Sequence, residues 1–374
     1  MLDDVEILCP TRANELVAGV HEPEAPARAD VAVDASPRHR VSRRDFLVAG
    51  IALSAGCAIA PLTACSSRDG EKRVILYTSA DGEVADPVLA LFTQRTGIRV
   101  ESVRDTEATK TTGLVRRIID EAAAPKAQVL WSNEAMAVAR LEREGLLAPL
   151  TDGSKYARLA SRARVIVYDT RSVGPSRTIP TLPSGLADLL RPEFKSRIGI
   201  ARPQFGTTRA HISAVRLALG EPAFREWCSR LRDHGIRQYA GNSSVVQAVA
   251  NAEIAIGLTD TDDVWAGKRN GWPLEMAYPS DESIVPRPIL IPNTVALLKH
   301  ASGSAPSRSL LDFLRGTDVE RLMVESELKH IPRDPALVAR YADRMPPNAA
   351  EPDWAALDRV SDDAIGIWEA IVGV

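Results

Sequence analysis

Short apolar runs rich in β-branched residues alternate with amphipathic segments through most of the 374-residue chain, and this alternation restricts the fold more than any other feature. The apolar runs predict strands at 73–78, 98–103, 128–131, 164–168, 197–200, 253–258 and 293–298. The segments between them predict a helix through Phe92, then helices at 109–123, 135–144, 207–219, 221–234, 242–251, 262–270 and 307–314. Strands separated by single helices form parallel βαβ units, so the sequence predicts an α/β fold.

An apolar run from residue 46 to residue 67 contains no Asp, Glu, Lys or Arg and follows a pair of arginines closely. Two arginines before such a run resemble a twin-arginine export signal. The end of the run, from Leu62 to Cys65, resembles a bacterial lipoprotein processing site. We therefore expect residues 1–67 to be an export signal and processing region with a long disordered start, and Cys65 to receive lipid. A transmembrane helix is the alternative reading, but Pro61 would break it near its end.

The composition limits the function. The chain has 46 basic and 49 acidic residues, and 45% hydrophobic with 25% charged residues is ordinary for a soluble globular protein. Nucleic-acid binding and wholesale disorder are therefore not favoured. The sequence contains no Gly-x-Ser-x-Gly, His-Glu-x-x-His or Walker motif. We expect a protein that is not an enzyme and that works in the periplasm or cell envelope, held to the membrane by a lipid anchor only.

Several weak sequence patterns follow one another in a defined order. They lie at 74–79, 92–100, 129–134, 141–150, 161–169, 242–249 and 253–259. In this order, over about residues 73–335, they resemble the ferric-ion-binding family of extracellular solute-binding proteins. The resemblance implies a two-lobe periplasmic-binding-protein fold of type II, with mixed or parallel sheets and flanking helices. Lobe 1 would comprise 73–165 with 283–320, and lobe 2 would comprise 166–282 with 321–374.

The resemblance also implies how the protein works. Members of that family hold a ligand in the cleft between the lobes, close on it, and deliver it to an ABC permease and its ATPase at the inner membrane. For this chain the implied transported ligand is Fe(III) with a synergistic anion, and no catalytic cofactor is implied. The alternatives are a binding protein for a phosphonate, a phosphate ester or a polyamine. A sensor module and a metal-dependent hydrolase are weaker alternatives.

Loops that follow the strands supply the candidate ligand-binding residues, because open α/β sheets bind ligands at the carboxyl ends of their strands. Gly206, Thr207 and Thr208 precede a predicted helix, whose free N–H groups and dipole favour an anion. Capping of that helix by one of the threonines is the alternative. The full set of candidates is Tyr77, Ser79, Asp81, Asn133, Glu134, Gly206, Thr207, Thr208, Asn242, Asp260, Asp262 and Asp263.

Three carboxylates lie within four positions, at Asp260, Asp262 and Asp263. Capping the next helix requires one or two of them, and the third favours a cation. Ferric-ion binders have two adjacent tyrosines where this chain has Asp262 and Asp263. Their histidine falls at Asp81 and their glutamate at Asn133. With the glutamate beside Asn133, such a set holds a hard cation with an anion, or else an ammonium group. The candidate metal ligands are Asp81, Glu134, Asp262 and Asp263.

Overall fold

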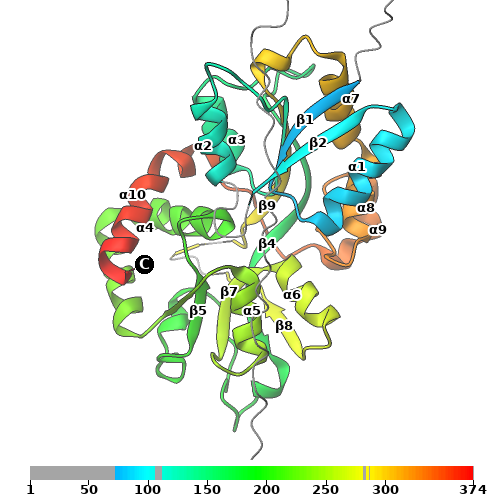
Figure 1. Cartoon of the computed structure of the whole chain (residues 1–374). Coiled ribbons are helices and arrows are strands. Elements are labelled where there is room, and N and C mark those ends of the chain that lie inside the picture. The colour runs from blue at the N-terminus through cyan, green and yellow to red at the C-terminus, as the bar shows by residue number, and fades with distance from the viewer. Residues whose placement is uncertain (1–71, 106–111, 281–283, 286, 374) are drawn as a thin grey trace, which may run out of the picture. The chain divides into compact units, whose positions relative to one another are not determined.

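The computed structural model describes residues 72–105, 112–280, 284–285 and 287–373, all within one compact unit, Ser66–Val374 (Figure 1). The predicted export signal and the predicted lipidation site at Cys65 lie outside the described residues. Within the described ranges, none of the helices combines the length and the apolar character that crossing a membrane requires.

A nine-stranded mixed sheet runs through the described part of the chain. Its strands are β1 (Arg73–Thr78), β2 (Arg99–Arg104), β3 (Val129–Ser132), β4 (Ala157–Asp169), β5 (Ile198–Ala201), β6 (Arg237–Tyr239), β7 (Ile256–Asp260), β8 (Leu274–Ala277) and β9 (Leu290–Leu297). Their order is β2-β1-β3-β9-β4-β7-β5-β6, with β8 paired to β4. The βαβ pairs β1–β2, β1–β3, β5–β6 and β5–β7 are parallel, as the sequence predicts. Strands β4 and β9 run antiparallel to their neighbours.

The helices connect these strands. They are α1 (Gly82–Thr96), α2 (Thr112–Asp120), α3 (Met136–Arg143), α4 (Gly206–Asp233), α5 (Asn242–Ala250), α6 (Thr261–Arg269), α7 (Ala305–Leu314), α8 (Thr317–Glu325), α9 (Pro335–Arg340) and α10 (Trp354–Val372). Short 3₁₀ turns lie at Thr170–Ser172, Ala187–Leu190, Pro192–Phe194, Lys299–Ala301 and Ala342–Arg344. Gly220 has a φ of 72° and kinks α4 where the sequence predicts the end of one helix and the start of another.

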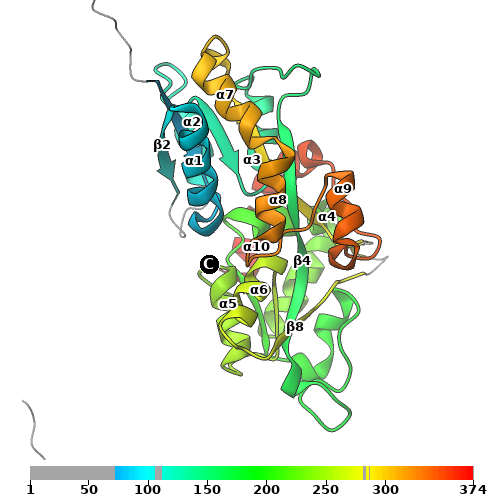
Figure 2. The same ribbon diagram turned by 90° about the vertical axis from the view of Figure 1, so that its right-hand side faces the viewer.

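Each half of the sheet is covered by apolar side chains on both faces. In the half that contains β1, β3 and β9, one core includes residues of α1, α7 and α8, which contact one another (Figure 2). The opposite core includes residues of α2 and α3. In the half that contains β5 and β7, α4 and α10 form one core, and α5 and α6 contribute to the other. Because α10 contacts both α4 and α3, it joins the two halves (Figure 1).

The 13-residue strand β4 takes part in both halves, since it pairs with β9 first and with β7 and β8 further along. Its register with β9 shifts between Arg158 and Ser161, which marks a β-bulge. The sequence predicts only 164–168 as strand, because Arg158, Ser161 and Arg162 interrupt the apolar pattern. In the structure Ser161 and Arg162 are nevertheless buried, so a long strand carries polar side chains into the middle of the molecule.

Gly257 in β7 packs closely against α5. A Cβ at this position would lie 2.4 Å from Val245 Cγ1 and 3.1 Å from Val167 Cγ1. Gly257→Ala is therefore expected to lower the free energy of unfolding by about 1–3 kcal/mol, measured by urea denaturation, because the valines must move apart. Gly366→Ala is the matched control, since nothing lies within 4 Å of a Cβ there. An equal loss in both variants would contradict the packing argument.

Candidate functional site

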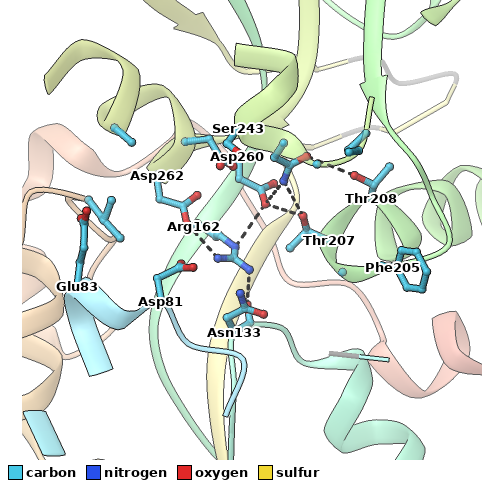
Figure 3. Close-up of a pocket in the computed structure, with 18 of the residues that line it drawn as sticks. Asp81, Glu83, Asn133, Arg162, Phe205, Thr207, Thr208, Ser243, Asp260 and Asp262 are labelled. Atoms are coloured by element: carbon cyan, nitrogen blue, oxygen red, sulfur yellow. Dashed lines mark hydrogen bonds and ion pairs between the residues drawn. The ribbon is translucent and has the colours of Figure 1, made fainter. Parts of the chain in front are cut away.

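A cavity of about 310 Å³ lies where the loops after β1, β3, β5 and β7 meet the first turns of α4, α5 and α6 (Figure 3). Nine of the sequence-predicted candidates line it, namely Asp81, Asn133, Gly206, Thr207, Thr208, Asn242, Asp260, Asp262 and Asp263. The rule that ligands bind at the carboxyl ends of the strands therefore locates the cavity in this mixed sheet. Arg162, from β4, lines the cavity beside them.

Asp260 is the centre of a buried hydrogen-bond network at one side of the cavity. Its Oδ1 accepts a hydrogen bond from Arg164 Nη1 at 2.8 Å, and its Oδ2 accepts one from Thr207 Oγ1 at 2.5 Å and one from Asn242 Nδ2 at 3.0 Å. The network joins β7, β4 and the first turns of α4 and α5. The Thr207 hydroxyl is thus engaged by a carboxylate, and its role is to hold the start of α4 against β7.

Arg162 connects two sides of the cavity. Its Nη1 donates to Asp262 Oδ2 at 3.0 Å, and its Nη2 donates to the Asn133 carbonyl oxygen at 2.6 Å (Figure 3). Its Nε lies 3.4 Å from Asp260 Oδ2, an ion-pair contact without a hydrogen bond. Burial lowers the pKa of Arg162, but four carboxylates outweigh burial and raise that pKa above its ordinary value. They belong to Asp262, Asp260, Asp81 and Asp263.

The carboxylates of Asp260, Asp262 and Asp263 form one cluster, in which an oxygen of each lies within 4.8 Å of the others. Asp262 is only 6% exposed, and its Oδ1 has no hydrogen-bond partner among the described residues. Asp263 Oδ2 accepts a hydrogen bond from Thr259 Oγ1 at 3.3 Å. A buried carboxylate oxygen without a partner is costly. The cavity therefore contains an acceptor that a bound cation or donor would satisfy.

Three helices begin at the cavity without a side-chain cap. The N-cap positions of α4, α5 and α6 are Phe205, Gly241 and Asp260, and none of the three makes a side-chain capping hydrogen bond. The expectation that Thr207 or Thr208 caps α4 is therefore wrong, and so is the expectation that an aspartate caps α6. The Asp260 carboxylate is directed to Arg164 instead. Uncapped N–H groups at three helix starts favour an anion in the cavity.

Two further candidates support the cavity from outside it. The hydroxyl of Tyr77 donates to Glu121 Oε2 at 2.8 Å, and its ring is buried in the core between α2 and α3. Burial raises the pKa of Tyr77 to about 12, with Glu121 acting in the same direction. Ser79 Oγ donates to Asn133 Oδ1 at 3.1 Å and accepts from Asn133 N–H at 3.0 Å. Ser79 thereby ties the loop after β1 to the loop after β3.

Glu134 lies apart from the aspartate cluster. It lines a second cavity between α2, α3, α4 and α10, and its carboxylate accepts hydrogen bonds from the N–H groups of Met136 at 2.7 Å and Ala137 at 2.9 Å. Burial raises the pKa of Glu134 to about 7, although these hydrogen bonds lower it. The structure therefore places Glu134 at the first turn of α3 and does not bring it together with Asp262.

The raised pKa of Glu134 predicts a pH-dependent stability. The folded protein binds this proton more tightly than the unfolded chain, whose glutamate has a pKa of 4.5. The free energy of unfolding should therefore fall by up to about 3 kcal/mol as the pH rises from about 4.5 through about 7. Urea denaturation at several pH values measures this fall. Glu134→Gln should flatten it, whereas the exposed control Glu226→Gln should not; the same slope in both variants would contradict the assignment.

At the mouth of the cavity an ion pair joins α1 to α6. Arg269 Nη1 donates to Glu83 Oε2 at 2.7 Å, and Arg269 Nη2 donates to Glu83 Oε1 at 2.9 Å. Glu83 follows the loop that carries Asp81, and Arg269 ends the helix that carries Asp262. Both side chains are largely exposed. The ion pair thus joins the two sides of the cavity at its solvent edge.

The sequence interpretation missed Arg162 and Arg164. Both lie on β4 and are 4% and 1% exposed. The signal was present as two arginines, one residue apart, beside the apolar run 165–167. A buried strand keeps charged residues only if they are paired. Two such arginines therefore predict buried acidic partners elsewhere in the chain, which the aspartates after β7 supply.

Comparisons with known proteins agree with this architecture. Residues 74–326 match the family model described as bacterial extracellular solute-binding protein. The major ferric iron-binding protein of Neisseria gonorrhoeae is 26% identical over 285 residues, which is 72% of this chain and 83% of that protein. Iron uptake protein A2 of Synechocystis sp. is 25% identical over 80% of this chain and 90% of its own length. The crystal structure of iron-bound HitA from Pseudomonas aeruginosa superimposes with a TM-score of 0.66 at 20% identity, covering 80% of this chain and 99% of HitA.

Proposed function

Since this chain belongs to the family of bacterial extracellular solute-binding proteins and has their two-lobe fold, we propose that it is the ligand-binding component of an ABC importer. In this proposal the lobes close on a ligand and the closed form delivers it to an inner-membrane permease with its ATPase. The protein carries out no catalysis. The lobe boundaries remain those predicted from the sequence.

The proposed ligand is Fe(III) accompanied by an anion. The observation that carries the proposal is the cluster of Asp260, Asp262 and Asp263 with the unpartnered Oδ1 of Asp262. Carboxylate oxygens suit a hard cation, and Asp81 lines the same cavity. The uncapped first turns of α4 and α5 supply N–H groups for the anion. The names of the two iron-related relatives support iron as the cation.

A ligand that carries an ammonium group and an anionic group is the second candidate. The observation that favours it is Arg162, because its guanidinium shows that a nitrogen cation fits among these carboxylates. An aminophosphonate would place its ammonium near Asp262 and its phosphonate at the helix starts. The phosphate-ester and polyamine alternatives each use one half of the same arrangement.

We also propose that residues 1–67 direct export by the twin-arginine route and that Cys65 carries the lipid that anchors the protein to the cell envelope. The sequence of the apolar run supports this proposal. In cells fed radiolabelled palmitate, the wild-type protein should incorporate label and Cys65→Ser should not. Label in the variant would show that another position is lipidated.

Thermal unfolding of the purified chain tests the ligand. Fe(III) with carbonate or citrate should raise the melting temperature, as should any specific ligand, because binding stabilises by about 2.7 kcal/mol at a hundredfold excess over Kd. Phosphate esters, an aminophosphonate and spermidine form the comparison set. A shift with an aminophosphonate and none with Fe(III) would replace iron by the second candidate. No shift with any of them would contradict the proposed function.

A further inference from the structure

Arg162 occupies the position between the carboxylates where a captured cation would be expected. Its guanidinium contacts Asp262 on α6, Asp260 at the end of β7, and the Asn133 carbonyl oxygen in the loop after β3. The raised pKa of Arg162 shows that the carboxylates of Asp81 and Asp263 also act on it. Four negative charges are thus directed at one positive charge that belongs to the protein itself (Figure 3).

Two buried polar atoms in this group have no hydrogen-bond partner in the part of the chain that the structure describes. One is the acceptor Asp262 Oδ1 and the other is the donor Arg162 Nε. The two residues are 6% and 4% exposed, so water does not easily satisfy them. A cation alone would satisfy the acceptor but would also stand beside the guanidinium. An anion alone would satisfy the donor but would face the aspartates. Only a ligand of both signs matches both atoms.

We propose that Arg162 is the specificity-determining residue of the cavity: its guanidinium is a built-in cation of the aspartate cluster, and it admits a metal cation only together with an anion that accepts its hydrogen bonds. This inference rests on the proposed function. On binding, the metal takes carboxylate oxygens of the cluster, and the guanidinium turns its donors to the anion. No bond is made or broken in the protein other than hydrogen bonds and ion pairs.

The expected effect follows from charge repulsion. Two like unit charges 4 Å apart at an effective dielectric constant of 20 repel strongly enough to change an equilibrium constant by roughly a thousandfold. A flexible arginine that moves aside retains part of this effect. Removing the charge of Arg162 should therefore strengthen the binding of an unaccompanied trivalent cation by about a hundredfold. A residue that merely supported the fold would weaken binding when replaced.

Terbium(III) is a suitable probe, because it is a hard trivalent cation that stays soluble near pH 6.5. We would titrate it calorimetrically into the purified full-length chain, with and without 1 mM malonate as the anion. In the wild type, malonate should tighten terbium binding at least about tenfold. Arg162→Gln should bind terbium alone about a hundredfold more tightly than the wild type does, and malonate should bring no gain. Arg162→Lys keeps the charge and should behave as the wild type.

Three results would overturn the inference. The first is wild-type binding of terbium that malonate does not change, and this result does not depend on any variant folding. The second is an Arg162→Gln variant with a normal circular dichroism spectrum that binds terbium alone no more tightly than the wild type. The third is an Arg162→Lys variant that gains affinity as Arg162→Gln does. If the wild type binds neither terbium nor Fe(III) under any of these conditions, the proposed function itself fails.

Discussion

Replacing Arg164 by methionine is expected to lower the free energy of unfolding by about 3–5 kcal/mol, because it leaves the carboxylate of Asp260 buried without its cation. Arg164 is 1% exposed, donates to Asp260 Oδ1 at 2.8 Å and lies 3.3 Å from the Nδ1 of His211, to which its Nε donates. Burial and the Arg164 charge lower the pKa of His211 well below its ordinary value, so this histidine does not compensate Asp260. Urea denaturation at pH 7 measures the loss.

Arg158 on the same strand supplies the matched control. It pairs with Glu351 at 3.1 Å, but its side chain is largely exposed. Arg158→Met should therefore cost less than about 1 kcal/mol. Adding Asp260→Asn to the Arg164→Met variant should recover part of the loss, since no buried charge then remains unpaired. A loss in Arg164→Met as small as that in Arg158→Met would contradict the network described around Asp260.

Asp262→Asn is expected to weaken binding of the transported ligand by about a hundredfold, equivalent to about 2.7 kcal/mol, while the protein remains folded. Asparagine still accepts the hydrogen bond from Arg162 Nη1, so the local structure is preserved. The variant lacks the negative charge at the oxygen that has no partner among the described residues. The ligand that gives the thermal shift in the wild type, titrated calorimetrically into both proteins, measures the change.

Asp318→Asn is the control for this substitution. Asp318 is an exposed residue of α8 that pairs with Arg95, and its replacement should leave affinity unchanged. Asp262→Asn with wild-type affinity would show that the carboxylate serves Arg162 alone. The loss should be specific for ligands that carry a positive charge, because the helix starts that face an anion are not altered.

Most elements of the fold could be predicted because their side chains report burial directly. The run 73–78 is apolar and becomes β1, and the helical spacing within 242–251 becomes α5. The failures share a cause. Strand β6 has three residues, two of them Arg237 and Gln238, and the first half of β4 carries arginines. In both, pairing with neighbouring strands outweighs a sequence pattern that does not look apolar.

The cavity could be predicted from topology, but its electrostatics could not. The loops that carry Asp81 and Asp262 follow strands, so their convergence follows from the sheet. Whether a given carboxylate faces the cavity depends on partners far away in the sequence. Asn133 and Glu134 are neighbours, yet the N–H groups at the start of α3 take Glu134 into a different cavity. Asp262 lies 100 residues from Arg162, and no local pattern joins them.

The ion pair between Glu83 and Arg269 makes the retention of a ligand depend on the surrounding medium. Because both side chains are largely exposed, their attraction contributes no more than about 1 kcal/mol and weakens as salt shortens the Debye length. The buried contacts of Arg162 and Arg164 are screened far less. A cell in fresh water would thus keep its cargo behind a firmer closure than a cell in brine, with the same protein and the same recognition chemistry inside it.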